Sequence, residues 1–408
     1  MQKGRQSFSL KNPVYIRSSY TIVGPKEGKS NFAEYFDTIL KDDLWGEKSY
    51  EKAESKMHRE AIRGAVCKGG LDFEEVDLML AGDLLNEISA SNLAMRYFQV
   101  PFAGLYNACA TYCESILIGA PLIDAGIVRT VACSTSSHFA SAERQYRYPL
   151  ELGNQRTPTS QWTVTGAGCT VLTAKRPTRA QDETAKEEFT EKLRKAQCAG
   201  LENCVPDNKT SMGLVERLKR KVARVFGKTR SDNAECELTC DPNYERTHVA
   251  RITGGTFGKV VDLGIKDESN MGAVMAPAAA DTLMAHLTDT GRMPEDYDMI
   301  ITGDLGRFGR DALLYLLGKE GIRLPSTYLD CGAEYFKPEQ ETFQGGSGAG
   351  CVNTAFNACF LKRLERGELN RILVLATGAL LNKDTPLQKE TIPGICHAFV
   401  VENEPIKP

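Results

Sequence analysis

The chain repeats itself, and this repetition limits the folds that it can adopt. Residues Val76–Leu84 read VDLMLAGDL and recur as YDMIITGDL in Tyr297–Leu305, while Asn107–Thr135 aligns without a gap on Ala349–Thr377. In each copy an apolar run of strand type ends at Gly-Asp, and later a turn of small residues carries a cysteine into an amphipathic helix. Because two copies of one pattern indicate a duplicated domain, we expect two similar α/β halves.

The order of elements in the first half favours a mostly parallel sheet with helices on both faces. Its elements are predicted as helices at about 49–68, 86–97 and 109–125 and strands at about 76–81, 100–106 and 128–134. An alternation of strands and helices is typical of such a sheet. The second copy is predicted to run from about Gly272 to Glu402.

The composition changes abruptly between the two copies. From about 176 to 246, charged residues dominate and apolar residues become sparse. We therefore predict an N-terminal half at 1–175, a charged insertion at 176–246 and a C-terminal half at 247–408. Within the insertion, the pattern of Ser211–Phe226 predicts a basic amphipathic helix. This helix could lie on an anionic membrane or in a protein groove, or it could dock on its own domain.

Composition excludes several classes of protein. The formal charge of −3, from 50 basic and 53 acidic residues, argues against a nucleic-acid partner. Thirteen scattered cysteines suit reduced thiols in a cytosol-like compartment, and the spacing of Cys198, Cys204, Cys236 and Cys240 is loose for zinc, so no metal is predicted. The N-terminus leads into no apolar segment, so neither a signal peptide nor a membrane span is expected.

Cys109 is the first candidate for chemistry, because a thiol at a helix N-terminus has an environment that lowers its pKa. The alternative is an inert cysteine packed in a tight turn. Asp83 and Asp304 end equivalent strands, where they either position a ligand or cap the following helices. Gly345–Gly350 could cradle an anion, or it could allow two helices to pack closely.

A second group of candidates follows the strand predicted to end near 134. His138 could act as a base or an anion donor, or it could be a loop histidine bonded to the backbone. Arg144 and Arg147 would share a helical face, where guanidinium groups could hold a carboxylate or phosphate while Tyr146 or Tyr148 stacks on a ring. Internal salt bridges or a subunit contact would explain the same arginines.

These residues resemble the thiolase superfamily, in which a cysteine at a helix N-terminus is the nucleophile. Asn107-Ala-Cys109 matches the position of the condensing-enzyme nucleophile, and Gly345–Gly350 is similar to the glycine motif of the second half. Within the superfamily the resemblance is closer to the stage V sporulation protein AD family. The strings that carry it are Leu80–Asn86, Thr135–His138, Ala142–Pro149, Thr163–Gly166, Val261–Ile265, Met275–Asp281, Ala376–Leu381 and Gln388–Pro393.

The resemblance implies a thiolase-type fold of two βαβαβαββ halves in five αβαβα layers, assembled as a homodimer. It also implies binding of dipicolinic acid, alone or with Ca²⁺, and uptake of that ligand into the forespore of a sporulating bacterium. Membrane-embedded proteins of the same transport complex would be the partners, and the protein would be peripheral to the spore inner membrane. No resident cofactor is expected. The ligand would lie near Cys109, with Asp83, His138, Arg144, Arg147 and Tyr148 close to it.

The sequence departs from catalytic thiolases in ways that favour a binding protein over an enzyme. Residues 341–348 lack the histidine of the thiolase Gly-His-Pro motif, and Cys396 and His397 are displaced from the position of the second thiolase cysteine. A catalytic pair formed by Cys109 and a rearranged His397 is one remaining alternative. Another is an acyltransferase of the ketoacyl synthase III type, with Cys109 as nucleophile and His138 or His397 as base. A structural scaffold with a relic pocket is the third reading, and the insertion is a departure from the sporulation family.

Overall fold

The computed structural model describes residues 1–146, 156–199, 246–382 and 384–406. In this part of the chain each half contributes five strands in the same order, β5-β4-β6-β8-β2 in the first half and β11-β10-β13-β14-β9 in the second. Their bounds are β2 Ser7–Val23, β4 Leu78–Gly82, β5 Phe102–Gly104, β6 Thr130–Ser137, β8 Gly166–Thr173, β9 His248–Thr256, β10 Met299–Thr302, β11 Leu329–Asp330, β13 Arg371–Ala379 and β14 Gly394–Pro405. The predicted duplication is confirmed.

Strand direction also follows the repeat. In each half the three outer strands are parallel, the fourth strand (β8 or β14) runs antiparallel to them, and the innermost strand (β2 or β9) runs parallel to them again. Antiparallel pairing of β2 with β9 joins the two halves. Four short strands complete the sheets: β1 Gln2–Lys3, β3 Thr38–Ile39, β7 Trp162–Thr163 and β12 Gly346–Ser347.

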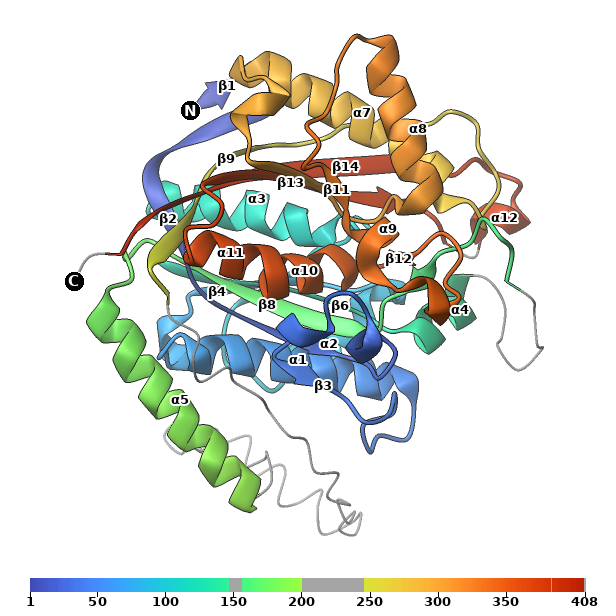
Figure 1. Ribbon diagram of the computed structural model, residues 1–408. Coiled ribbons are helices and arrows are strands. Elements are labelled where there is room, and N and C mark those ends of the chain that lie inside the picture. The colour runs from blue at the N-terminus through green and yellow to red at the C-terminus, as the bar shows by residue number, and fades with distance from the viewer. Residues whose placement is uncertain (147–155, 200–245, 383, 407–408) are drawn as a thin grey trace.

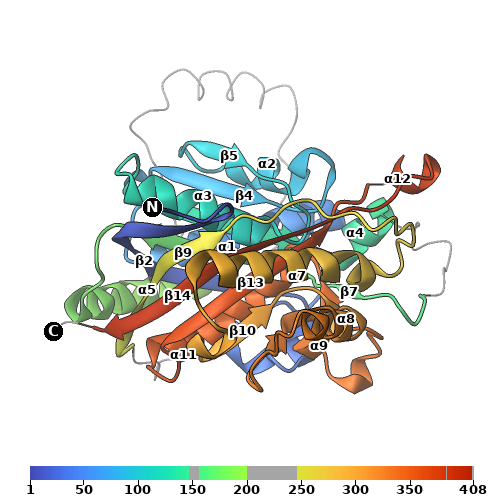
Figure 2. The same ribbon diagram turned by 90° about the horizontal axis from the view of Figure 1, so that it is seen from above.

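Helices form the other layers of the molecule. Their bounds are α1 Tyr50–Lys68, α2 Ser89–Met95, α3 Thr111–Asp124, α4 Phe139–Tyr146, α5 Arg179–Ala199, α7 Met271–Thr290, α8 Gly306–Lys319, α9 Cys331–Tyr335, α10 Cys351–Ala355, α11 Leu361–Glu365 and α12 Asp384–Leu387. In Figure 1, α1 and α2 cover one sheet, α7 and α8 cover the other, and α3, α10 and α11 lie between the sheets. The view from above shows α7 lying across β13 and β14 (Figure 2). The five predicted layers are therefore present.

The pattern of apolar residues explains the positions of α1 and α3. The Ser49 side chain accepts a hydrogen bond from the Lys52 amide at the start of α1, and small or apolar residues at every fourth position, such as Met57 and Ala61, are buried against the sheet. By contrast, α3 buries residues on most of its circumference, Ile116 and Leu117 among them. A helix that lies between two sheets needs apolar side chains on both sides, which is why α3 has the more hydrophobic sequence.

The described beginning of the predicted insertion is docked on the first half. Helix α5 buries Ala185 and Phe189, and the Phe189 ring meets the Tyr20 ring edge-on with centroids 6.0 Å apart. The predicted basic helix at 211–226 lies outside the described residues. The part of the insertion nearest the fold is therefore packed as an integral helix.

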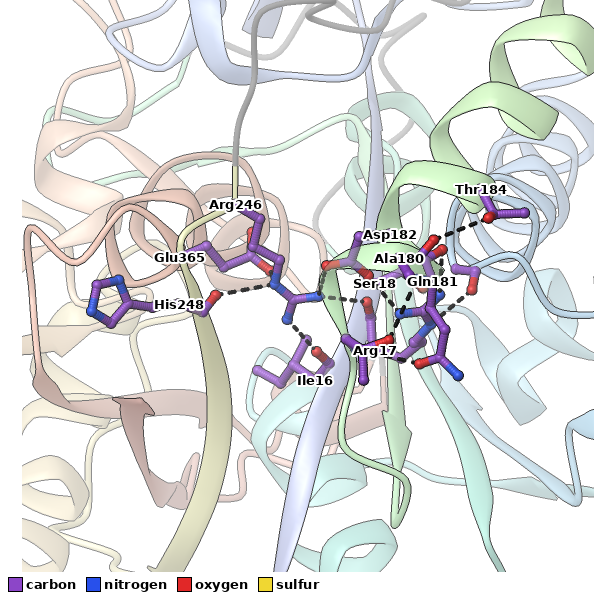
Figure 3. Close-up of polar contacts among 12 residues, drawn as sticks. Ile16, Arg17, Ser18, Ala180, Gln181, Asp182, Thr184, Arg246, His248 and Glu365 are labelled. Carbon is purple, nitrogen blue, oxygen red and sulfur yellow. Dashed lines mark hydrogen bonds and ion pairs between the residues drawn. The ribbon is translucent and has the colours of Figure 1, made fainter. Parts of the chain in front are cut away.

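An ionic cluster ties the two ends of the insertion together (Figure 3). Asp182 on α5 pairs with Arg17 of β2 at 2.6 Å and with Arg246 at 3.5 Å, and Arg246 pairs with Glu365 of α11 at 3.1 Å. Arg246 also donates to the Ile16 carbonyl at 2.7 Å. We call these four charged residues, Arg17, Asp182, Arg246 and Glu365, the insertion clasp.

Candidate functional site

The turn that carries Cys109 is wedged between the two halves. Gly82 at the end of β4 and Gly378 in β13 lie against it so closely that an added Cβ would stand 2.1 Å and 2.4 Å from backbone oxygens of the turn. Ala108, just before the cysteine, has a φ of 51°, a conformation that costs a non-glycine residue on the order of 1 kcal/mol. The cysteine is thus held where strands of both halves end, two residues before α3.

Cys109 lines a small cavity between the halves. Its volume is about 30 Å³, and only 5% of the cysteine surface is exposed. Pockets for small ligands usually measure about 300–1,000 Å³, so side chains must move before anything much larger than water enters. The lining residues, mostly apolar, are Leu84, Ala108, Cys109, Ala142, Glu143, Tyr146, Thr163, Met271, Ser347, Gly348, Ala379 and Leu381.

Helix α4 closes one side of this cavity. It contributes Ala142, Glu143 and Tyr146 to the lining. The Tyr146 hydroxyl donates to the Leu84 carbonyl and lies 3.0 Å from the Tyr106 hydroxyl. The sequence predicts Tyr146 as a stacking residue. In the structure it forms a wall of the cavity through its contact with Leu84, and a local motif cannot reveal this contact because the two residues are 62 positions apart.

His138 lies between β6 and α4, at the predicted strand end, but both of its ring nitrogens have other partners. Its Nε2 donates to the Asp43 carbonyl at 2.8 Å, and its Nδ1 accepts from the Ala140 amide at 3.2 Å. Burial lowers the pKa of His138, which keeps the ring neutral. It does not belong to the cavity lining, so the structure does not bring it together with Cys109 as predicted.

The predicted arginine patch is only partly visible. Arg144 lies on α4 and pairs with Glu51 of α1 at 3.0 Å, at the surface and outside the cavity lining. Arg147 and Tyr148 lie outside the described residues. Their predicted roles stay predictions.

His397 lies closer to the cysteine turn than His138 does. On β14, its Nε2 is 3.3 Å from the side-chain nitrogen of Asn107, and its Nδ1 accepts from the backbone N–H of Gly258 at 3.1 Å. Burial lowers the pKa of His397 to about 4, so the ring is neutral. With its Nδ1 occupied and its Nε2 at Asn107, the ring positions the turn that precedes Cys109.

The two repeated aspartates have different roles. Asp83 accepts from the Ser91 amide at 2.7 Å and the Ser91 hydroxyl at 2.6 Å, which caps α2 as predicted. For Asp304 the predicted cap of α8 is wrong: Asp330 accepts from the amides of Leu305 and Gly306 instead. Asp304 is fully buried, and burial, followed by the charge of Asp330, raises its pKa well above the usual value.

Neither a membrane span nor a metal cluster is found in the described ranges. No described helix is both long and apolar enough to cross a bilayer. Within the same ranges, three or more His, Cys, Asp or Glu side chains do not gather in an arrangement that could hold a metal ion.

The duplicated halves, the central helices and the cysteine before α3 define a thiolase-fold protein. OleA from Xanthomonas campestris has the same fold: its cerulenin-bound structure gives a TM-score of 0.51 at 13% identity, and its acetamide-bound structure 0.50 at 14%, each covering 96% of this chain and 99% of that chain. At such low identity the likeness concerns the fold alone.

Sequence comparison identifies the particular family. The family model of stage V sporulation protein AD matches residues 4–186 and 237–402. Stage V sporulation protein AD of Bacillus subtilis (strain 168) is 33% identical over 399 residues, which cover 98% of this chain and 97% of that protein. The chain belongs to the stage V sporulation protein AD family. Residues 187–236, most of the predicted insertion, lie outside the family match.

Proposed function

We propose that this protein binds dipicolinate, alone or with Ca²⁺, at the Cys109 cavity and supports its uptake into the forespore. Membership of the stage V sporulation protein AD family is the observation that carries the proposal. The cavity lies where strands of both halves end, which is the usual place for ligands in α/β sheets. Because its volume is only about 30 Å³, binding requires an open form in which α4 or its side chains have moved.

The surroundings of Cys109 support binding rather than catalysis. A condensing enzyme needs a base and an oxyanion donor beside its nucleophile. The ring nitrogens of His138 and His397 contact other groups, and burial lowers the pKa of both rings, which makes them weaker bases. We therefore propose that the ancestral reaction has been lost.

A second candidate function is acyl transfer by Cys109, as in ketoacyl synthase III. The position of the cysteine before α3, in a fold shared with OleA, favours this reading. A burst of acylation at Cys109 on mixing with an acyl-CoA would support it. Absence of acylation together with dipicolinate binding would leave the carrier function.

Arg144 can contribute to binding only by exchanging partners. It now pairs with Glu51, and both side chains are exposed, at 42% and 36%. Exposed ion pairs contribute about 0–1 kcal/mol, so a ligand carboxylate could replace Glu51 at small cost. Arg144→Ala is then expected to weaken dipicolinate binding, whereas Arg129→Ala, which removes another exposed arginine, is expected to leave it unchanged.

Calorimetric titration with dipicolinate, with and without Ca²⁺, tests the proposal. The Cys109→Trp variant fills the cavity and is expected to abolish binding, whereas Cys109→Ala keeps the space and is expected to bind within about tenfold of the unmodified protein. Equal binding by both variants would place the ligand elsewhere. No binding by the unmodified protein would contradict the proposed function.

We also propose that the protein is a homodimer that works with membrane-embedded partners at the forespore membrane. Strand β5 is the outer strand of the first half, with Ala103 exposed, and such an edge can pair with a second copy. Ala103→Glu is expected to lower the measured mass in light scattering from dimer to monomer. Thr327→Glu, beside β11 at the opposite edge, serves as the control.

Deletion of 200–245 tests whether the insertion binds liposomes or those partners.

A further inference from the structure

Two pairs of side chains hold α4 on α1 at the closed side of the Cys109 cavity. Glu51 and Glu54 lie one turn apart on α1, and they contact Arg144 and Ser141, which lie one turn apart on α4. The outer pair is an exposed salt bridge. The inner pair is fully buried: the Ser141 Oγ lies 2.7 Å from Glu54 Oε2, and Glu54 has no exposed surface.

The hydrogen bonds around Glu54 require more hydrogens than the serines supply. Ser141 Oγ contacts Glu54 and the His138 carbonyl at 3.1 Å, while Ser136 Oγ contacts Glu54 Oε1 and His58 Nδ1, each at 3.1 Å. The two Ser136 contacts are satisfied when His58 Nδ1 carries the ring hydrogen, but the single Ser141 hydrogen cannot serve both Glu54 and the His138 carbonyl. A proton on Glu54 lets its carboxyl group donate to Ser141, whose own hydrogen then reaches the His138 carbonyl. The neutral acid therefore fits this site better than the carboxylate.

The charges that face Glu54 oppose its ionisation. The titratable groups around it are Asp83 after β4, His58 and Glu51 on α1, and His138 at the start of α4. Burial lowers the pKa of His58 to about 3 and lowers that of His138, so neither supplies a positive charge. Burial, then the charge of Asp83, raises the pKa of Glu54 well above its usual value.

We propose that Glu54 is a proton-controlled latch: as a neutral acid it holds α4 against the Cys109 cavity, and its ionisation releases α4 and opens the cavity. The proposal rests on the proposed function only in taking this cavity as the ligand site. Because the closed form holds a proton that the open form can lose, the open population increases with pH, by up to about tenfold per pH unit. Glu54 is thus a positioning residue that acts through Ser141.

The rate at which iodoacetamide alkylates Cys109 reports the opening without any ligand. We compare the unmodified protein with Glu54→Gln, whose amide imitates the neutral acid, and with Ser141→Ala, which removes the latch contact. Comparing variants at the same pH cancels the titration of the thiol itself. The ratio of the unmodified rate to the Glu54→Gln rate is expected to be near one at about pH 6 and to grow severalfold by about pH 8. Ser141→Ala should react faster at every pH.

Glu51→Gln is the control for the exposed pair: it also removes the weakest of the charges that raise the pKa of Glu54, and it should change the rate less than about twofold. Hydrogen exchange of the α4 amides should follow the same order of variants. The latch is overturned if unmodified protein and Glu54→Gln react alike at all pH values, or if the core thiols Cys113 and Cys133 react together with Cys109. A working latch without dipicolinate binding would contradict the proposed function alone.

Discussion

The two halves begin from the same sequence pattern and end in different surroundings. Cys109 lines a cavity with 5% of its surface exposed, whereas Cys351 is fully buried and its thiol donates to the Gly303 carbonyl at 3.4 Å. Asp83 caps α2, whereas Asp330 has taken the capping role from Asp304. A duplicated fold can therefore keep a potential ligand site in one copy and fill the equivalent place with packed core in the other.

The largest expected difference between the halves concerns their equivalent glycines. A Cβ at Gly82 would stand 2.1 Å from a backbone oxygen, whereas one at Gly303 would meet the Val352 side chain at 2.9 Å. Because the overlap at Gly82 is much deeper, Gly82→Ala is expected to lower the free energy of unfolding by about 3 kcal/mol and Gly303→Ala by about 1 kcal/mol. Urea unfolding measures both, and equal losses would show that the two turns are equally tight.

The two cysteines should differ next in reactivity. Burial raises the pKa of Cys351 well above its usual value, and thiolate is the reactive form. Cys109 is therefore expected to be alkylated at least about tenfold faster than Cys351 in the folded protein, and dipicolinate should slow only the Cys109 reaction. Peptide mapping after timed alkylation gives both rates. Faster alkylation of Cys351 than of Cys109 would contradict the expected difference between the two halves.

The two aspartates should differ least in their effect on the free energy of unfolding, because burial raises the pKa of both carboxyl groups and Asp83 additionally caps α2. Asp83→Asn removes an acceptor from the α2 cap and should destabilise the protein by about 1 kcal/mol. The pKa of Asp304 is raised on folding, so its stabilising effect is complete at low pH and is lost as pH rises toward the folded pKa. Asp304→Asn should therefore gain stability relative to the unmodified protein over that range, by at most about 1.4 kcal/mol per pH unit.

Thermal unfolding at several pH values separates the two cases. A difference between Asp304→Asn and the unmodified protein that does not change with pH would show that this carboxyl group is ionised in the fold. A neutral effect of Asp83→Asn would remove the cap as an explanation for its position.

The repeated pattern was enough to predict two similar α/β halves, whereas the five layers were implied by the resemblance to the thiolase superfamily. The turn at Cys109 was also predictable, since small residues before an apolar helix form a recognisable local pattern. What the sequence could not reveal are partners that are distant along the chain. His138 bonds to Asp43, and Arg144 pairs with Glu51, each about ninety residues away.

The cavity itself shows the same limit. Ordinary apolar residues such as Leu84, Met271 and Ala379 line it, and nothing in their local sequence distinguishes them from core. That Asp330 rather than Asp304 caps α8 could not be predicted, because Asp330 ends another strand, β11, 24 residues away along the chain from Gly306. Polar motifs therefore indicated the region of the candidate site, while its walls depend on how the halves meet.

The insertion clasp has a consequence for how this family can change in length. Asp182 and Arg246 lie on either side of the segment outside the family match and are only 3.5 Å apart. When two ends are fixed at one point, the entropic cost of closing a flexible segment between them grows only with the logarithm of its length. Residues added beyond Phe189, which packs on Tyr20, would therefore leave the strands and the cysteine cavity with their geometry.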